Sequence, residues 1–401
     1  MRDQKRLLRQ LIPLSMALFA VGTDGFIIAG LLPQIAADLD VSVAVAGQLV
    51  TAFALAFAVS APILGALTSG MDRRAALLLA LAIFVVGNAA TAMGPNYEIV
   101  IIARVVTAMG AGLIGAAAFS AAAAIAPEQR RGRALAFVMG GLTLAIAFGL
   151  PAGTLIGGAD WRLTLWAVAA LGVVAAAGVT VALGPISLPA VTLRDRLAPL
   201  REIRVFGMLA VTVLTLAGTH VLYTYISPAV AGATGGSATS LTVVLLAWGV
   251  GNMVGNMAAG RLADRFPPRQ VVSWGLAAAA VMLGISPQAT GDFAMTIVWA
   301  VLWGVCVSLP VVPQQSRLVA HAPDAAAVLL GLNNSAIYVG VALGGALGGL
   351  LQEQLTPAGL GLAGAAVSVA GLLANLATRR AVPRADATDR SPGSHGSHTL
   401  R

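Results

Sequence analysis

GALTSGMDRR occupies residues 65–74, and GRLADRFPPR occupies residues 260–269. Each decapeptide follows a long apolar segment, and their Gly, Leu and final Arg coincide at a spacing of 195 residues. Each also comes between the second and third apolar segments of its half of the chain. These features predict a duplicated six-helix unit, an architecture typical of transporters that bind substrate between the repeats near the membrane midplane.

The composition predicts a chain embedded in a membrane. Of 401 residues, 58% are hydrophobic and 10% are charged, whereas soluble domains carry about 25% charged residues. This excludes soluble, disordered and collagen-like classes. Since one span needs about 20 apolar residues, we predict an all-α membrane protein with twelve transmembrane helices in two six-helix bundles. The predicted spans are 11–33, 46–68, 75–95, 98–122, 133–157, 162–184, 206–230, 239–260, 270–289, 293–314, 326–351 and 358–378.

The chain divides at its middle. Residues 185–205 contain three prolines and six charges and are predicted to be a cytoplasmic linker. It joins an N-terminal bundle, residues 1–184, to a C-terminal bundle, residues 206–380. Residues 381–401 are expected to be a disordered cytoplasmic tail because they are polar and of low complexity.

The arginines predict the orientation. Among 24 cations, only Arg104 and Arg162 fall outside the predicted inner loops and tails, so the positive-inside rule places both termini in the cytoplasm and the chain in the cytoplasmic membrane. The net charge of +8 is therefore a topology signal, and no nucleic-acid partner is expected. We expect lipid as the surroundings and a functional monomer. The inner arginines are Arg73, Arg74, Arg130, Arg131, Arg133, Arg194, Arg196, Arg201, Arg204, Arg261, Arg265, Arg269 and Arg317.

Residue types needed for catalysis or cofactor binding are scarce. Cys306 is the only cysteine and Lys5 the only lysine, so the sequence contains neither a cysteine metal cluster nor a P-loop. No HExxH or GxSxG motif is present, and we expect no enzyme activity, cofactor or metal. His395 and His398 in the tail are interpreted as ordinary tail residues.

Four segments resemble the major facilitator superfamily, and within it the bacterial twelve-helix drug:proton antiporters. GRLADRFPPR is similar to the inner-loop motif G-x-L-x-D-R-x-G-R-R, and IIARVVTAMGAG (101–112) is similar to the fourth-helix motif. GLPAGTLIGGADWR (149–162) resembles the fifth-helix motif associated with antiporters, and residues 24–53 resemble the first two helices. The resemblance covers roughly 11–380 and implies proton-coupled efflux of a small organic molecule by alternating access.

A closer resemblance points to a substrate. LTLAGTHVLYTYISP (214–228), PVVPQQSRLVAHAPDAA (310–326) and NNSAIYVGVALGGALGG (333–349) are similar to purine base and nucleoside efflux pumps. Sugar-efflux and chloramphenicol-resistance transporters share much of this pattern, so both stay alternatives. A non-transporting membrane receptor or scaffold on the same fold is an alternative of another class.

The chain departs from the family pattern at two places. Ser69 and Gly70 replace the Asp-Arg pair of the first inner-loop motif, which implies a weaker or differently paired latch. Relatives carry a first-helix Glu at the position of Gly25, whereas this chain has Asp24 one residue earlier. One residue turns a side chain by about 100° around a helix.

Asp24 and Arg104 are the candidate proton-coupling residues. Asp24 is the one acid in the middle of a predicted span, and a buried acid whose charge depends on its surroundings is what proton coupling requires. Counted to Pro33 and to the outer end of the fourth span, the two residues lie roughly 13 Å and roughly 9 Å deep. They can pair if their helices are neighbours, as the resemblance implies. The alternatives are a structural hydrogen bond at Asp24 and snorkelling of Arg104.

Two further groups match motifs. In the fifth span, glycines at spacings of four predict close helix packing with a proline kink that seals one side of the transporter, and ordinary packing is the alternative. In the inner loops, the motif residues predict a charged gate, and topological charge is the alternative. The fifth-span group is Gly149, Pro151, Gly153, Gly157 and Gly158, and the inner-loop group is Gly65, Asp72, Arg73, Arg74, Gly260, Asp264, Arg265 and Arg269.

Polar and aromatic residues inside the second-half spans predict a substrate cavity. Amides and tyrosines supply donors, acceptors and a stacking face for a planar base, and interhelical hydrogen bonding is the alternative. The candidates are His220, Tyr223, Tyr225, Asn252, Gln314, Asn333 and Asn334.

Overall fold

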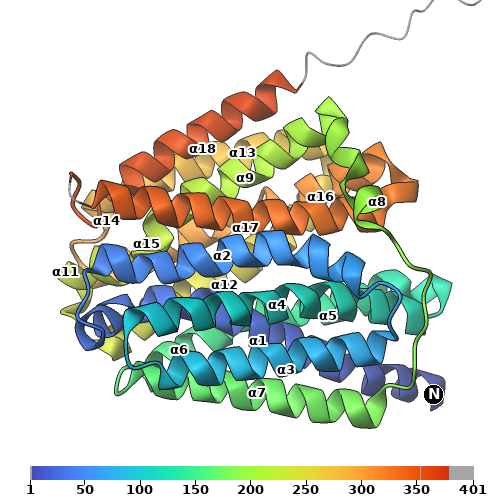
Figure 1. The fold of residues 1–401 in the computed structure, drawn as a ribbon. Helices are drawn as coiled ribbons and strands as arrows, with labels where there is room; N and C mark the ends of the chain where they lie inside the picture. The colour runs from blue at the N-terminus through green and yellow to red at the C-terminus, as the bar shows by residue number, and fades with distance from the viewer. Residues whose placement is uncertain (1, 353, 379–401) are drawn as a thin grey trace, which may run out of the picture.

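The computed structural model describes residues 2–352 and 354–378, and every regular element in them is helical. The predicted tail, with His395 and His398, lies outside the described residues. Long helices run side by side along one direction, and the N-terminus and the end of the last helix lie at the same end of the molecule (Figure 1). The first-half spans are α1 Arg2–Asp38, α2 Val43–Leu67, α3 Arg73–Met93, α4 Tyr97–Ile125, α5 Arg131–Leu144 continued by α6 Leu150–Gly157, and α7 Trp161–Ala182.

The second half repeats this order. Its spans are α9 Ile203–Tyr223 continued by α10 Ile226–Ala229 and α11 Ala231–Thr234, α12 Ala238–Arg265, α13 Pro268–Gly284 continued by α14 Ser286–Ala289, α15 Phe293–Ser308 continued by α16 Val311–His321, α17 Ala326–Leu351 and α18 Leu360–Ala377. Eleven helices or continued helices of the described chain are long and apolar enough to cross a membrane. α13, 17 residues long, is the twelfth. The predicted fold is confirmed.

The two halves match in register. Three helix starts recur 195 residues later, as Val43 and Ala238, Arg73 and Pro268, and Arg131 and Ala326. The N-caps recur as well, because the hydroxyls of Ser42 and Ser237 each accept a hydrogen bond from the backbone N–H three residues ahead. The spacing read from the two decapeptides therefore also relates three helix starts of the first half to three of the second.

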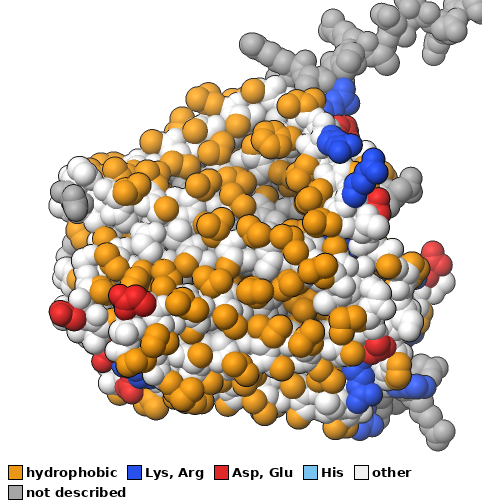
Figure 2. Space-filling view, in the orientation of Figure 1, with side chains coloured by type: hydrophobic (Ala, Val, Ile, Leu, Met, Phe, Trp, Pro, Cys, Tyr) orange, Lys and Arg blue, Asp and Glu red, His pale blue; other side chains and the backbone are white. Residues whose placement is uncertain are grey.

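The surface fits a bilayer. On the face shown in Figure 2, hydrophobic side chains spread over the middle of the molecule and charged side chains lie toward its two ends. We call the end where arginines gather the arginine end, and the end with Asp38, Glu98 and Asp160 the carboxylate end. At the carboxylate end, Arg162 forms an ion pair with Asp38 and donates to the carbonyl of Gly94 over 3.0 Å. This pairing accounts for an arginine outside the predicted inner loops.

The linker packs against the arginine end of the first half. Its short helix α8, Leu193–Leu197, contacts α2 of the first half and α17 of the second. The Arg196 guanidinium donates to the carbonyl of Gly65 over 3.1 Å, and the backbone N–H of Ile186 donates to the Asp72 carboxylate. Burial, with a smaller contribution from the positive charge of Arg73, lowers the pKa of Arg196. The linker is thus packed against the first half, and its helix α8 also touches the second half.

Several predicted span edges need correction. The first helix does not end at Pro33 but runs to Asp38, so Asp24 lies 14 residues from its end, or about 21 Å. The seventh span breaks after Tyr223 and continues in short helices. The fifth contains a π-helical turn, Ala145–Gly149, ahead of Pro151. Hydropathy marks apolar length, but it does not report the backbone hydrogen bonds on which helix ends and π-turns depend.

Candidate functional site

A fully buried ion pair lies between α1 and α4. The Arg104 guanidinium donates to Asp24 Oδ1 over 2.6 Å and to the Asp24 backbone carbonyl over 3.3 Å, and neither side chain has any exposed surface. Asp24 Oδ2 and Arg104 Nε have no hydrogen-bond partner among the described residues. The structure thus brings the two candidate coupling residues together, with one carboxylate oxygen left over for a proton, a water or a ligand.

The pair lies beside the boundary between the halves. The Arg104 guanidinium sits 4.3 Å from the centre of the Phe53 ring, a cation–π contact. A side chain at Gly25 would point elsewhere, because its Cβ would lie 3.7 Å from Phe53 and 3.8 Å from the Tyr338 hydroxyl of the second half. Tyr338 stacks on Phe57 of α2 with ring centres 3.7 Å apart. The acid at position 24 therefore pairs with Arg104 of α4, while position 25 faces Phe53 and Tyr338.

The glycines of the fifth span pack against the helix that carries Asp24. A Cβ at Gly149 would lie 2.1 Å from the Thr23 hydroxyl, and Cβ atoms at Gly153 and Gly157 would each lie 2.7 Å from side chains of Ile27 and Leu31. Pro151 is buried in the same segment. Gly158 instead faces the second half, where its Cβ would lie 2.7 Å from Ala238. Because glycine has no side chain, the backbones of the two helices can approach closely. The row of Gly149, Gly153 and Gly157 therefore sets the position of α1.

Aromatic rings from both halves meet in a second cluster, which we call the ring cluster: Phe26, His220, Tyr223, Trp248 and Trp303. Tyr223 lies 4.5 Å from Trp248 and 6.3 Å from Trp303, centre to centre. Phe26 of α1 approaches His220 at 6.1 Å and Tyr223 at 5.9 Å. Two predicted cavity residues, His220 and Tyr223, are thus together here. The sequence analysis did not single out Phe26, Trp248 or Trp303, although Trp248 follows Phe53 by the repeat spacing of 195.

Gln314 and Asn333 lie together at another level of the second half. Asn333 accepts a hydrogen bond from the Thr212 hydroxyl over 2.8 Å. Gln314 donates to the backbone carbonyl of Met208 and accepts from Arg317 over 2.8 Å. Both amides line a cavity of about 10 Å³, large enough for about one water. Their described bonds join helices α9, α16 and α17, while Asn252 and Asn334 are half-buried in α12 and α17.

Tyr225 lies apart from Tyr223, at the carboxylate end. Its hydroxyl donates to the backbone carbonyl of Gly345 over 2.9 Å. A Cβ at Gly47 of α2 would lie 2.3 Å from that hydroxyl, and one at Gly349 would lie 2.7 Å from it. Together with the contact between Gly158 and Ala238, this packing holds the two halves against each other at the carboxylate end.

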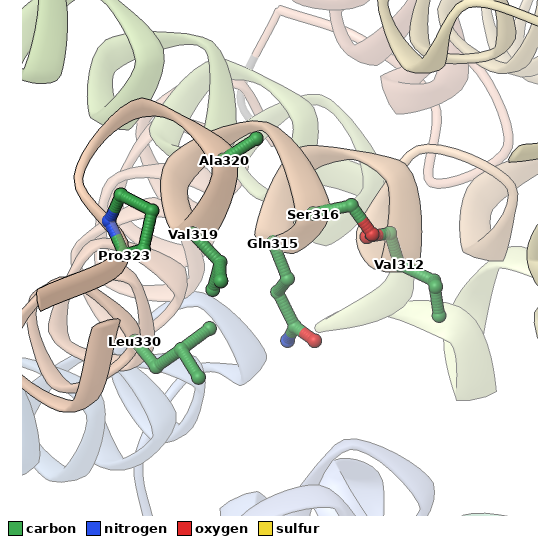
Figure 3. Close-up of a pocket in the computed structure, with 7 residues that line it drawn as sticks. All are labelled: Val312, Gln315, Ser316, Val319, Ala320, Pro323 and Leu330. Carbon is green, nitrogen blue, oxygen red and sulfur yellow. The ribbon is translucent and has the colours of Figure 1, made fainter.

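The arginine end is hollowed. A pocket of about 480 Å³ opens between α16 and the start of α17. Figure 3 shows Val312, Gln315 and Val319 projecting from one face of α16, with Leu330 of α17 facing them. Gln315 points into this pocket, whereas its neighbour Gln314 is tied into the helix contacts. Packing between the halves is thus seen at the carboxylate end, and the pocket of the second half lies at the arginine end.

The inner-loop arginines brace helices within each half. Arg74 donates to the carbonyl of Thr180 over 2.7 Å, and Arg269 donates to the carbonyl of Asn375 over 3.0 Å. Donor and acceptor each recur 195 residues on, so the repeated motif makes one repeated contact. The other residues of the inner-loop group do not share this repeated contact. Asp72 caps α3, Arg73 donates to the carbonyls of Thr68 and Ser69, Gly65 accepts from Arg196, and Gly260, Asp264 and Arg265 lie at the end of α12, where Asp264 and Arg265 are exposed.

Comparison with known families identifies the duplicated unit. The family model described as the Major Facilitator Superfamily matches residues 14–206 and again residues 208–398. The two matches correspond to the two halves of the repeat. Every described helix that forms a span, together with the linker, falls within or next to these matches.

Relatives and solved structures agree with that match. The inner membrane transport protein YdhP of Escherichia coli (strain K12) is 35% identical over 355 residues, covering 88% of this chain and 90% of the relative. The chloramphenicol resistance protein of Streptomyces lividans is 36% identical over 260 residues, covering 63% of this chain and 66% of the relative. A bacterial homologue of the human lysosomal transporter Spinster, in an inward-facing and occupied conformation, shares the fold with a TM-score of 0.76 and 16% identity over 92% of this chain and 96% of that one.

Proposed function

This chain belongs to the major facilitator superfamily, and on that premise we propose that it exports a small organic molecule in exchange for protons by alternating access. The observation that carries the proposal is the fully buried pair of Asp24 and Arg104. A charge is expensive inside a membrane protein and is found where it has a partner and a function. The presence of this buried pair needs no soluble ion or nucleotide to explain it.

The surroundings of the pair support proton coupling. A proton on Asp24 neutralises the carboxylate and so weakens its attraction to Arg104, which means that proton binding and ion pairing compete. The pair lies next to Gly25, whose face meets Tyr338 across the boundary between the halves. A change at Asp24 therefore acts on the surface along which the halves move.

The energy of one proton is sufficient. One charge moved through about 100 mV yields about 2.3 kcal/mol, which sustains roughly a 50-fold concentration gradient of a neutral substrate. A single titrating acid therefore accounts for concentrative export.

The distribution of charge and packing supports a direction. With the arginine end in the cytoplasm, the open pocket of about 480 Å³ faces the cytoplasm and the packed end faces outward. This is the conformation in which an exporter receives its substrate. Both chain termini then lie in the cytoplasm, and the protein resides in the cytoplasmic membrane.

Two substrate classes are candidates. A purine base or nucleoside is implied by the resemblance of segments 214–228, 310–326 and 333–349 to purine efflux pumps. A chloramphenicol-type drug is favoured by the 36% identity to a chloramphenicol resistance protein. Both are compact neutral molecules with an aromatic ring.

The test is uptake of radiolabelled hypoxanthine, and separately chloramphenicol, into inverted vesicles with and without an imposed proton gradient. Asp24→Asn should abolish gradient-driven accumulation. Asp38→Asn is the matched control, because Asp38 also lies on α1 and pairs with an arginine, Arg162 of α7, but its side chain is 41% exposed. Accumulation that survives in Asp24→Asn would remove this acid from the mechanism. Accumulation of neither compound by the wild-type protein would refute both substrate classes.

A further inference from the structure

The ring cluster contains four buried polar atoms without a hydrogen-bond partner among the described residues. They are His220 Nε2, the Tyr223 hydroxyl, Trp248 Nε1 and Trp303 Nε1. Their side chains are only 1–3% exposed. Buried polar groups in folded proteins are almost always hydrogen-bonded, so four such atoms within one set of touching rings point to a ligand.

The chemistry of these four atoms is defined. His220 Nδ1 lies 2.9 Å from the carbonyl of Leu216, and a carbonyl only accepts, so Nδ1 carries the hydrogen. In the neutral imidazole, Nε2 is then an acceptor. Indole nitrogens only donate, and a phenol does both. The cluster therefore offers two fixed donors, one fixed acceptor and one hydroxyl that adapts.

The cluster also lies at a suitable place. Trp248 and Trp303 are each 10 residues from the carboxylate-end start of their helix, or about 15 Å deep, near the middle of a bilayer. Phe26 comes from the first half and the other four rings come from the second. Motion of the halves therefore moves Phe26 relative to His220 and Tyr223.

The charges near the ring cluster further restrict the chemical class of its ligand. Among the described residues, Asp24 is the one buried carboxylate, and it is already paired with Arg104. A cationic ligand would find no unpaired buried carboxylate. Aromatic rings pair favourably with other aromatic rings, so the cluster favours an aromatic ligand over a sugar.

We propose that the ring cluster binds a neutral, planar aromatic substrate that presents hydrogen-bond acceptors to the indole N–H groups of Trp248 and Trp303 and a donor to His220 Nε2. This inference rests on the proposed transport function and specifies its substrate chemistry. Phe26 forms the first-half wall of the site and leaves the other rings when the halves separate.

The test measures equilibrium binding of radiolabelled hypoxanthine and chloramphenicol to the purified protein in lipid nanodiscs, without a gradient. Unlabelled xylose and tetraphenylphosphonium are the competitors. At least one ring compound should bind, and neither competitor should displace it. Trp248→Phe and Trp303→Phe keep a ring but remove the donor, and each should weaken binding about tenfold.

Trp299→Phe is the matched control. Its indole lies in the same helix as Trp303 and stacks on it at 4.9 Å, but its N–H already donates to the carbonyl of Met282 over 2.8 Å. It should change binding less than about twofold. Tyr223→Phe removes a single oxygen and tests the site if a tryptophan variant fails to fold.

Failure has separate signatures. Absence of binding of both ring compounds, displacement by xylose or tetraphenylphosphonium, or equal weakening by Trp299→Phe would overturn the assigned site. Binding with the expected pattern but without gradient-driven uptake would refute the proposed function and leave this inference standing. Gradient-driven uptake that is insensitive to Trp248→Phe and Trp303→Phe would refute the inferred site and leave the proposed function standing.

Discussion

Breaking the buried ion pair from its two sides should have different pH dependences. In Asp24→Asn the guanidinium of Arg104 stays buried without a carboxylate, and an arginine cannot release its proton in a protein. In Arg104→Gln the carboxylate stays behind, and a carboxylate can remove its charge by binding a proton. The stability lost in Asp24→Asn is therefore the same at every pH, while the stability lost in Arg104→Gln becomes smaller as the pH falls.

The magnitude follows from the geometry. Both groups are fully buried and bonded over 2.6 Å, and removing one partner of such a pair costs about 3–5 kcal/mol. Asp24→Asn retains the backbone carbonyl that accepts from Arg104, so we expect the lower figure of about 3 kcal/mol. In Arg104→Gln the folded state binds a proton that the unfolded chain releases above about pH 4. Its stability therefore falls as pH rises, by up to about 1.4 kcal/mol per pH unit.

The assay is thermal unfolding in detergent between pH 5 and pH 8, followed by tryptophan fluorescence. Each variant is compared with the wild-type protein at the same pH, so that other titrating groups cancel. The Tm deficit of Arg104→Gln should shrink toward pH 5, and that of Asp24→Asn should stay constant. Parallel curves for the two variants would refute the assignment of Asp24 as a buried acid that exchanges a proton for its partner.

Two further predictions concern the motifs. Gly149→Ala places a Cβ 2.1 Å from the Thr23 hydroxyl, so it should lower stability by about 1–3 kcal/mol and impair transport. Gly140→Ala is the control, because its Cβ would have nothing within 4 Å, and it should leave Tm and uptake unchanged. Equal effects of the two variants would contradict the packing role of Gly149. Arg269→Ala loses the bonds to the last carbonyls of α18 and should lower stability by about 1–2 kcal/mol, whereas the exposed Arg265→Ala should stay within about 0.5 kcal/mol, as thermal unfolding will show.

The twelve spans and their duplication were predictable because a membrane imposes one strong requirement on sequence. Each span must be apolar over about 20 residues, and cations must stay on one side. Even the pairing of Asp24 with Arg104 could be anticipated, since each is a rare charge inside a predicted span. The equal contacts of Arg74 and Arg269 follow from the same repeat, because duplicated sequence places donor and acceptor at duplicated positions.

Side-chain direction could not be predicted in the same way. Gln314 and Gln315 are adjacent, yet one binds Met208 and Arg317 while the other faces the pocket. Tyr223 and Tyr225 are two residues apart, but a helix break between them sends the first into the ring cluster and the second to the carboxylate end. Hydropathy does not reveal such helix breaks, because the side chains on every face of a span are mostly apolar.

The apolar spans, their number and the two rare charges are properties of single segments in contact with lipid, so the local amino-acid sequence specifies them. The ring cluster is different, because Phe26, Tyr223, Trp248 and Trp303 come from four helices that approach one another only after both halves have packed. Helix packing without a hydrophobic driving force between apolar surfaces depends on glycine contacts and individual hydrogen bonds. Those contacts, rather than the pattern of any one helix, assemble the candidate binding site.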